Sequence, residues 1–142
     1  MAALPAVPVA LVGEEETVVL PAFQWTPLHF AALHGRAATA AALVGRGANL
    51  HAEAFDSSRP LHFASGEGHA ATVDELIQGG ADINAQNDVD FTPLHFAAKK
   101  GQTDAVKVLV EAGAAVDVPD DEDRTPMDWA TNEAIRALLI TL

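Results

Sequence analysis

The feature that most constrains the fold of this chain is an internal repeat of 33 residues. Four segments share the pattern Thr-Pro-Leu-His-Phe-Ala-Ala or a close variant, and they begin at Thr26, Arg59, Thr92 and Thr125. Other positions keep the same step, namely Gly35, Gly68 and Gly101, then Gly47, Gly80 and Gly113, then Leu43, Leu76 and Leu109. Several independent positions in register indicate a repeat architecture, in which one structural unit recurs along the chain.

Each repeat predicts two short helices. Proline follows the first residue of the pattern, where the first turn of a helix does not need the missing N–H. The glycines at 35, 68 and 101 supply the positive φ that ends this first helix. A second helix, also ended by a glycine, is expected over 37–46, 70–78 and 103–111. Because a helix pair this short buries its apolar side only against another pair, the sequence predicts an all-α stack.

The pattern resembles the ankyrin repeat family, whose repeats usually end in a segment similar to Gly80-Ala81-Asp82-Ile83-Asn84. The resemblance covers residues 26–142. It implies an all-α solenoid of three full repeats and a shortened C-terminal cap, with antiparallel helices and connections that project as fingers. Residues 1–25 are expected to form an N-terminal extension, either an arm over the first unit or a tail that is flexible or ordered only by a partner.

The chain departs from the family pattern two residues before the Thr position. The family usually has glycine there, whereas this chain has Gln24, Ser57, Asp90 and Asp123. If the position needs positive φ, aspartate tolerates it best, and Gln24 and Ser57 predict either about 1 kcal/mol of strain or a different turn. The fourth unit also lacks the glycine between its helices, which fits a cap. The alanine-rich stretch from Ala37 to Leu43 is expected to bury little area and to be the least stable part.

Three histidines, His29, His62 and His95, occupy the same position of successive repeats. Stacking would place them about 8–10 Å apart, too far to share a metal whose ligands lie within about 2.1 Å. We therefore expect each imidazole to bond turn backbone and the Thr hydroxyl, with Asp128 in this role in the fourth unit. The residues of this structural motif are Thr26, His29, His62, Thr92, His95, Thr125 and Asp128. The other histidines, His34, His51 and His69, are expected to be solvated.

No catalytic, cofactor or metal site is expected. The three serines lack a nucleophile-elbow context, and no Gly-rich loop carries the Lys-Ser or Lys-Thr of a phosphate site. The acidic run 120–123 lacks the spaced ligands of a calcium loop and is expected to be a solvated charge run. A stack of short hairpins also encloses no deep pocket, so no small-molecule substrate is expected. The chain is not expected to be an enzyme.

The charge balance narrows the class of partner. Lys and Arg number 8 against 20 Asp and Glu, a formal net charge of −12. Such a surface repels nucleic acid and anionic lipid and favours a basic protein partner. Residues 1–20 lack the features of a secretory signal, and no run is long enough to cross a bilayer. With no cysteine, nothing points to an oxidising compartment, and an intracellular location (cytosol, nucleus or organelle interior) is expected.

By resemblance to ankyrin proteins, partner-binding residues fall at fixed positions on the fingers and first helices. Those positions hold Phe23, Trp25, Leu33 and His34, then Asp56, Ser58, Gly66 and Glu67 with Phe55 beside them, then Val89, Phe91, Lys99 and Lys100, then Glu122, Arg124, Asn132 and Glu133. Four of these residues are aromatic: Phe23, Trp25, Phe55 and Phe91. They either anchor a partner or have a packing role, between adjacent fingers or over the open flank of the first unit. The packing role over that flank is favoured for Trp25, and partner contact is favoured for Phe91.

The sequence thus predicts a non-catalytic protein–protein interaction module, an adaptor or regulator that binds through its concave finger and first-helix surface. The alternative is a small permanent subunit of a large multiprotein complex. A further possibility is hydroxylation of Asn84, whose surroundings resemble those of asparagines that oxygenases modify in ankyrin proteins. The competing interpretation is that Asn84 simply bonds turn backbone.

Overall fold

The computed structural model describes residues 25–140, and these form four helical hairpins in succession. The first helix of each hairpin begins at the proline that the repeat predicts. The hairpins are α1 (Pro27–Leu33) with α2 (Ala37–Gly45), α3 (Pro60–Gly66) with α4 (Ala70–Gln78), α5 (Pro93–Lys99) with α6 (Thr103–Glu111), and α7 (Pro126–Trp129) with α8 (Glu133–Ile140). The predicted all-α architecture is confirmed, and the second helices agree with their predicted bounds to within one residue.

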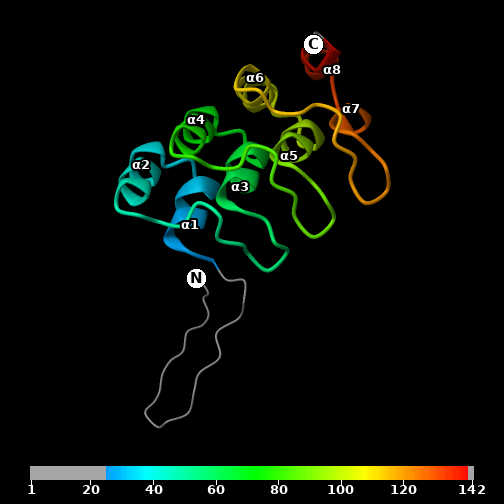
Figure 1. Cartoon of the computed structure of the whole chain (residues 1–142). Helices are drawn as coiled ribbons and strands as arrows, with labels where there is room; N and C mark the ends of the chain where they lie inside the picture. The colour runs from blue at the N-terminus through cyan, green and yellow to red at the C-terminus, as the bar shows by residue number, and fades with distance from the viewer. Residues whose placement is uncertain (1–24, 141–142) are drawn as a thin grey trace, which may run out of the picture.

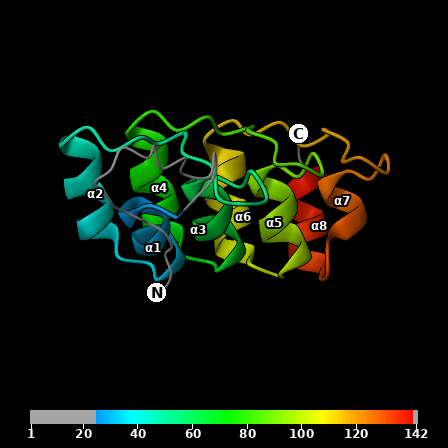
Figure 2. The same cartoon turned by 90° about the horizontal axis from the view of Figure 1, so that it is seen from below.

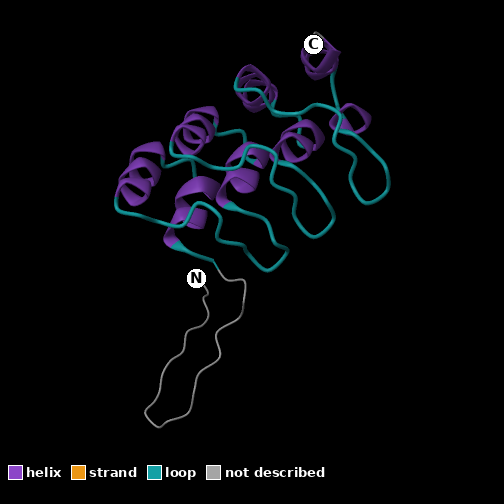
Figure 3. Ribbon diagram, in the orientation of Figure 1, coloured by secondary structure: helices purple, strands orange, loops and turns teal. Residues whose placement is uncertain are grey.

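The hairpins lie side by side as two rows of helices (Figures 1 and 2). Helices α1, α3, α5 and α7 form the inner row, and each contacts the next; α2, α4, α6 and α8 form the outer row in the same way. The connections between hairpins project from the inner row, on the side away from the outer row (Figure 3). We call these projections finger one (residues 54–58), finger two (87–91) and finger three (120–124). Within residues 25–140, no helix is long and apolar enough to span a membrane.

The glycines between the paired helices are required for two reasons. Gly35, Gly68 and Gly101 have φ of 69°, 79° and 73°, the left-handed region that favours glycine. In addition, a side chain of the next hairpin lies where a Cβ would stand, the His69 ring over Gly35 and the Gln102 amide over Gly68. The same two side chains bond the preceding hairpin, since His69 Nε2 donates to the carbonyl of Leu33 at 2.9 Å and Gln102 Nε2 to that of Gly66 at 3.0 Å.

His69 was therefore predicted wrongly as a solvated residue. It is half-buried, and it bonds the end of α1 across the hairpin interface. The spacing of the sequence places it at the start of α4, but only the stack shows that this position faces the preceding hairpin. His34 and His51 are exposed, as expected.

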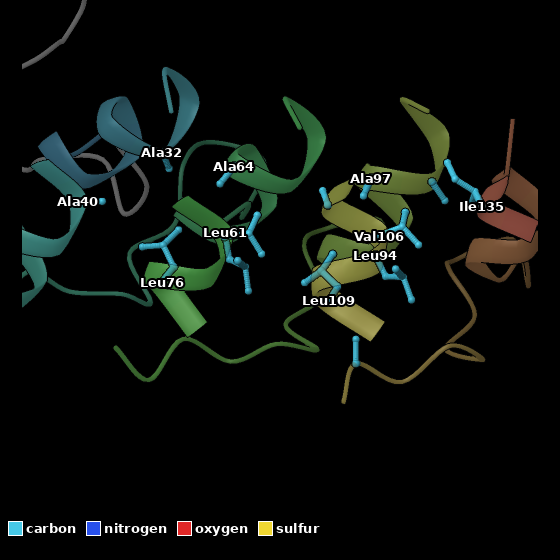
Figure 4. Packing of buried hydrophobic residues seen from close by; sticks show 14 of the residues in the cluster. Ala32, Ala40, Leu61, Ala64, Leu76, Leu94, Ala97, Val106, Leu109 and Ile135 are labelled. Atoms are coloured by element: carbon cyan, nitrogen blue, oxygen red, sulfur yellow. The ribbon is translucent and has the colours of Figure 1, made fainter. Parts of the chain in front are cut away.

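The core runs through the stack as repeated layers (Figure 4). Each of the first three inner helices buries one leucine, and α4 and α6 bury Leu76 and Leu109 completely. Alanines at the helix contacts, such as Ala64 and Ala97, have no exposed surface, which allows the close approach of neighbouring helices. The buried leucines of the inner row are Leu28, Leu61 and Leu94.

The two ends of the stack differ from its middle. In α2 only Ala40 is buried and Leu43 is half-buried, as expected for the alanine-rich stretch, because α2 has a described hairpin on one side only. At the other end, α7 has 4 residues and is followed by Ala130 in an extended conformation, with φ −60° and ψ 131°. Ile135 and Leu139 of α8 then close the core. The fourth hairpin is the shortened cap that the sequence predicts.

Candidate functional site

The fingers are attached to the inner helices by the repeated histidine. In the first unit, His29 Nδ1 accepts from the backbone N–H of Thr26 at 3.1 Å and lies 3.0 Å from its hydroxyl oxygen. On the other side of the ring, Nε2 donates to the carbonyl of Ser58 in finger one, at 3.3 Å. His95 repeats this arrangement with Thr92 and with the carbonyl of Arg124, at 3.1 and 2.9 Å.

His62 and Asp128 complete the same series. Arg59 replaces the threonine in the second unit, so His62 Nδ1 accepts only from the backbone N–H of Arg59, at 2.9 Å, while its Nε2 bonds the carbonyls of Ala85 and Phe91 at 3.0 and 2.9 Å. In the fourth unit Asp128 Oδ2 accepts from the N–H of Thr125 at 2.9 Å. In all four units the side chain at this position therefore accepts from the backbone N–H of the residue three places earlier.

The buried imidazoles are kept neutral. Burial lowers the pKa of His29 and His95, and it lowers the pKa of His62 from 6.5 to about 4. Hydrogen bonds to the carbonyls of the fingers oppose this change but do not cancel it. A neutral ring with its proton on Nε2 is the form that can accept at Nδ1 and donate to a finger at the same time.

Each of the last two finger turns is held by a side chain that accepts from its own backbone. In finger two, Asn87 Oδ1 accepts from the N–H groups of Val89 and Phe91 at 3.1 and 3.0 Å. In finger three, Asp120 Oδ1 accepts from the N–H groups of Glu122 and Arg124 at 2.8 and 2.9 Å. Asn87 and Asp120 are both buried, and they occupy the same position of successive repeats. That shared position is the signal in the sequence by which this role could have been predicted.

Asp120 was therefore predicted wrongly as part of a solvated charge run. Its side chain is buried, and Oδ2 also accepts from the indole N–H of Trp129 at 2.9 Å. Burial alone would raise its pKa, but the N–H groups of Arg124 and Glu122, the Trp129 indole and the Arg124 guanidinium outweigh burial and hold that pKa below the usual value. Asp121, Glu122 and Asp123 are exposed, as expected.

Successive fingers are joined to one another through their backbones. The N–H of Asp88 in finger two donates to the carbonyl of Asp56 in finger one, at 3.1 Å. The N–H of Asp121 in finger three donates to the carbonyl of Val89 in finger two, also at 3.1 Å. These bonds link the three fingers into one row beside the inner helices (Figure 1).

The residues expected to bind a partner divide by exposure. The exposed ones are His34, Phe55, Glu67, Val89, Lys99, Lys100, Glu122 and Glu133, and the half-buried ones are Trp25, Leu33, Asp56, Phe91, Arg124 and Asn132. Phe23 lies outside the described residues. Ser58 and Gly66 are buried and are not available to a partner, because Ser58 Oγ accepts from Asn87 Nδ2 and the Phe96 ring lies close to Gly66.

The half-buried aromatic residues pack on the hairpins. The Trp25 ring lies 4.7 Å from that of Phe63 in the second hairpin and 5.3 Å from the His29 ring. The Phe91 ring lies 5.1 Å from His95 and 5.4 Å from Trp129 in the fourth unit. Each ring therefore bridges two units and still keeps part of its surface exposed.

Two cations lie over the aromatic residues near finger three. Lys99 Nζ lies 5.6 Å from the Phe91 ring centre and 5.0 Å from that of Trp129. The Arg124 guanidinium lies 4.3 Å from the Trp129 ring and pairs with Glu122. Lys100 Nζ lies 3.6 Å from a carboxylate oxygen of Glu67.

The remaining polar candidates are accounted for within the fold. Asn84 is exposed, and its Oδ1 accepts from the N–H of Ala115 at 2.9 Å, so it does bond backbone, in the following repeat. Within residues 25–140, no group of three His, Cys, Asp or Glu side chains is placed to hold a metal ion.

The described part of the chain is thus a repeat protein, a row of helical hairpins with linked fingers along one face. A family model for ankyrin repeats in three copies matches residues 5–87 and 61–141, and the chain belongs to this family. Ankyrin repeats are general protein–protein interaction modules, and proteins built from them are generally non-catalytic. No curated protein sequence matches the chain.

Proposed function

We propose that this chain is a non-catalytic adaptor or regulator that binds a partner protein through its fingers and inner helices. The repeat domain 26–142 is the binding unit in this proposal, and residues 1–25 are an extension to it. The observation that carries the proposal is the place of the exposed apolar side chains. Of the four large ones among the described residues, Phe55 (70% exposed) and Val89 (38%) lie on fingers and Phe30 (37%) lies on α1, while Ile140 (68%) lies at the end of α8 in the outer row.

The charge of this surface favours a partner with basic groups. Asp88, Asp90, Asp121, Glu122 and Asp123 are exposed on fingers two and three, and the whole chain has a net charge of −12. Such a field accelerates encounter with a basic protein and opposes encounter with nucleic acid. Exposed apolar side chains with a charged border are typical of protein interfaces.

Crosslinking in the native source tests this function. A lysine-reactive reagent should join Lys99 or Lys100 to a partner protein, and mass spectrometry identifies the joined peptides. Phe91→Ala and Trp25→Ala should each weaken binding to that partner by about 2 kcal/mol or more if these rings are hot spots. A large loss of melting temperature with unchanged affinity would assign the two rings to packing alone.

The alternative function is that of a permanent subunit in a large assembly. The two functions differ in the amount of free monomer expected in native extracts. An adaptor dissociates from its partner as salt rises and appears as monomer, whereas a permanent subunit is absent from the monomer fraction. Size fractionation of native extracts at low and high salt distinguishes them. Intact mass of native material tests the separate proposal that Asn84 is hydroxylated, through a gain of one oxygen atom.

A further inference from the structure

A hollow of about 220 Å³ lies between finger two and the C-terminal end of α5. Phe91 and Phe96, whose ring centroids lie 5.9 Å apart, line it together with the exposed Val89. The contacts of the Phe91 ring with His95 and Trp129 hold that ring in place without a partner. The residues that line the hollow are Asn87, Val89, Phe91, Phe96, Lys99 and Lys100.

The size of the hollow favours part of a macromolecule over a small ligand. Small-molecule sites enclose about 300–1,000 Å³, and this hollow is smaller and open. One large apolar side chain such as Leu, Met or Phe fits such a volume, and preformed pockets of this kind receive the central side chains of protein interfaces.

Charged residues of opposite sign stand on the two elements that line the hollow. On finger two, the exposed Asp88 and Asp90 flank Val89 in sequence, and the exposed Asp121 of finger three donates its backbone N–H to the Val89 carbonyl. On the helix side, Lys99 and Lys100 are exposed. Lys99 is positioned over the Phe91 and Trp129 rings, and Lys100 beside Glu67. The finger that lines the hollow is therefore flanked by acidic side chains, and the helix end that lines it carries two ammonium groups, one of them paired with Glu67.

We propose that this hollow binds one large apolar side chain of an extended partner segment that is basic on one side of that residue and acidic on the other. The basic side faces Asp88, Asp90 and Asp121, and the acidic side faces Lys99 and Lys100. The inference rests on the proposed function, and it specifies the chemistry of the partner segment and the direction in which that segment crosses the hollow.

Selection from a random 12-residue peptide library displayed on phage, with the full chain as the immobilised target, tests this inference. The enriched peptides should contain Leu, Met or Phe between a Lys or Arg and an Asp or Glu. Replacing the apolar residue of a labelled synthetic peptide by Ala should weaken binding at least tenfold in fluorescence anisotropy.

Charge exchange tests the direction. The double variant Lys99→Glu/Lys100→Glu should weaken binding at least tenfold, and replacing the acidic residue of the peptide by Lys should restore it. Lys107→Glu is the matched control, because Lys107 is exposed on α6 of the outer row, and affinity should stay within twofold. The melting temperature of each variant confirms that it is folded.

Failure of the inference is separable from failure of the proposed function. Peptides that fail to enrich, or whose affinity is unchanged in the double variant, overturn the inference. If a native partner is still crosslinked in that case, the proposed function stands and the partner uses another part of the surface. If neither peptides nor a native partner bind, both are wrong.

Discussion

Finger one and finger three have the same backbone turn but hold it in different ways. In both, the first residue donates to the carbonyl of the fifth, Ala54 to Ser58 at 2.9 Å and Asp120 to Arg124 at 2.8 Å. In finger three the buried Asp120 carboxylate accepts from two backbone N–H groups and from an indole. In finger one that position is alanine, and the nearby Asp56 accepts from a single N–H, that of Ser58, at 3.0 Å.

Finger two is intermediate, because Asn87 accepts from two backbone N–H groups. The repeat therefore determines the conformation of the turn, whereas the side chain at the position of Ala54, Asn87 and Asp120 determines its stability. Finger one should be the most easily opened turn and finger three the least. The stability of the chain in acid and of variants at this position tests that order, and the effect of acid should be the largest.

The contributions of the buried histidines and of Asp120 to stability are lost in different pH ranges. The pKa of His62 is about 4 in the folded chain against 6.5 for an ordinary histidine, so the unfolded chain binds more protons between these values. The contribution of His62 to the free energy of unfolding is therefore fully present above pH 6.5. It falls as the pH drops towards 4, by about 3 kcal/mol in total. The pKa of Asp120 is lowered from 3.8, so its contribution is lost only at lower pH.

Urea unfolding at pH 7.5 and pH 4.5 measures this loss. Hydrogen exchange at pH 4.5 should then show finger one opening more readily than finger three, because the lowered pKa of Asp120 keeps a carboxylate that accepts from two backbone N–H groups and an indole, whereas Asp56 in finger one accepts from one N–H. Equal stability at both pH values would contradict the role of the buried histidines, and His62→Asn should reduce the pH dependence.

Without the Asp120 side chain, finger three should open more easily than finger one. Asp120→Ala leaves two backbone N–H groups and the Trp129 indole without their acceptor, which we expect to lower the free energy of unfolding by about 2–3 kcal/mol. Chemical denaturation measures the change. Asp121→Ala is the control, because Asp121 is exposed on the same finger and should change stability by less than about 0.5 kcal/mol.

Asn87→Ala gives finger two the alanine that stands in finger one. The variant loses one acceptor for the N–H groups of Val89 and Phe91 and one donor to Ser58, so we expect a loss of about 2 kcal/mol. Exchange protection of fingers one and two should become similar. A loss larger than that of Asp120→Ala would contradict the proposed order of the fingers.

The smallest effect concerns the left-handed residue of each finger. Ser57 has φ 66° and Asp90 has φ 64°, and aspartate adopts this conformation more readily than serine. Ser57→Gly should relieve strain and raise the free energy of unfolding by about 0.5 kcal/mol, after the greater entropy of the unfolded chain is subtracted. Thermal unfolding measures this change, and Asp90→Gly should gain less.

The repeat predicted the hairpins, their order and the short cap because each depends on residues close in sequence. Proline at 27, 60, 93 and 126 starts the inner helices, and glycine at 35, 68 and 101 ends or redirects them. The prediction that Ser57 either is strained or forms another turn is resolved in favour of the same left-handed turn.

The errors concern side chains whose surroundings come from residues distant in sequence or from another repeat. His69 was expected at the surface from its position in the repeat, and Asp120 from the acidic residues that follow it, whereas they bond Leu33 and Trp129. The same reason explains Ser58, which is buried by Asn87 of the next finger. Of the residues that line the hollow beside finger two, Val89, Phe91, Lys99 and Lys100 were named from the sequence. Asn87 and Phe96 were not, and the common volume depends on how finger two packs beside α5.

The backbone links between fingers bear on how the whole stack can deform. Between neighbouring fingers the described chain has one backbone hydrogen bond, from Asp88 to Asp56 and from Asp121 to Val89. Each hairpin contacts its neighbours in the row, so the curvature of the stack is the sum of small rotations between successive hairpins. A small change of rotation at each contact would therefore change the curvature of the whole row and, with it, the spacing of the three fingers.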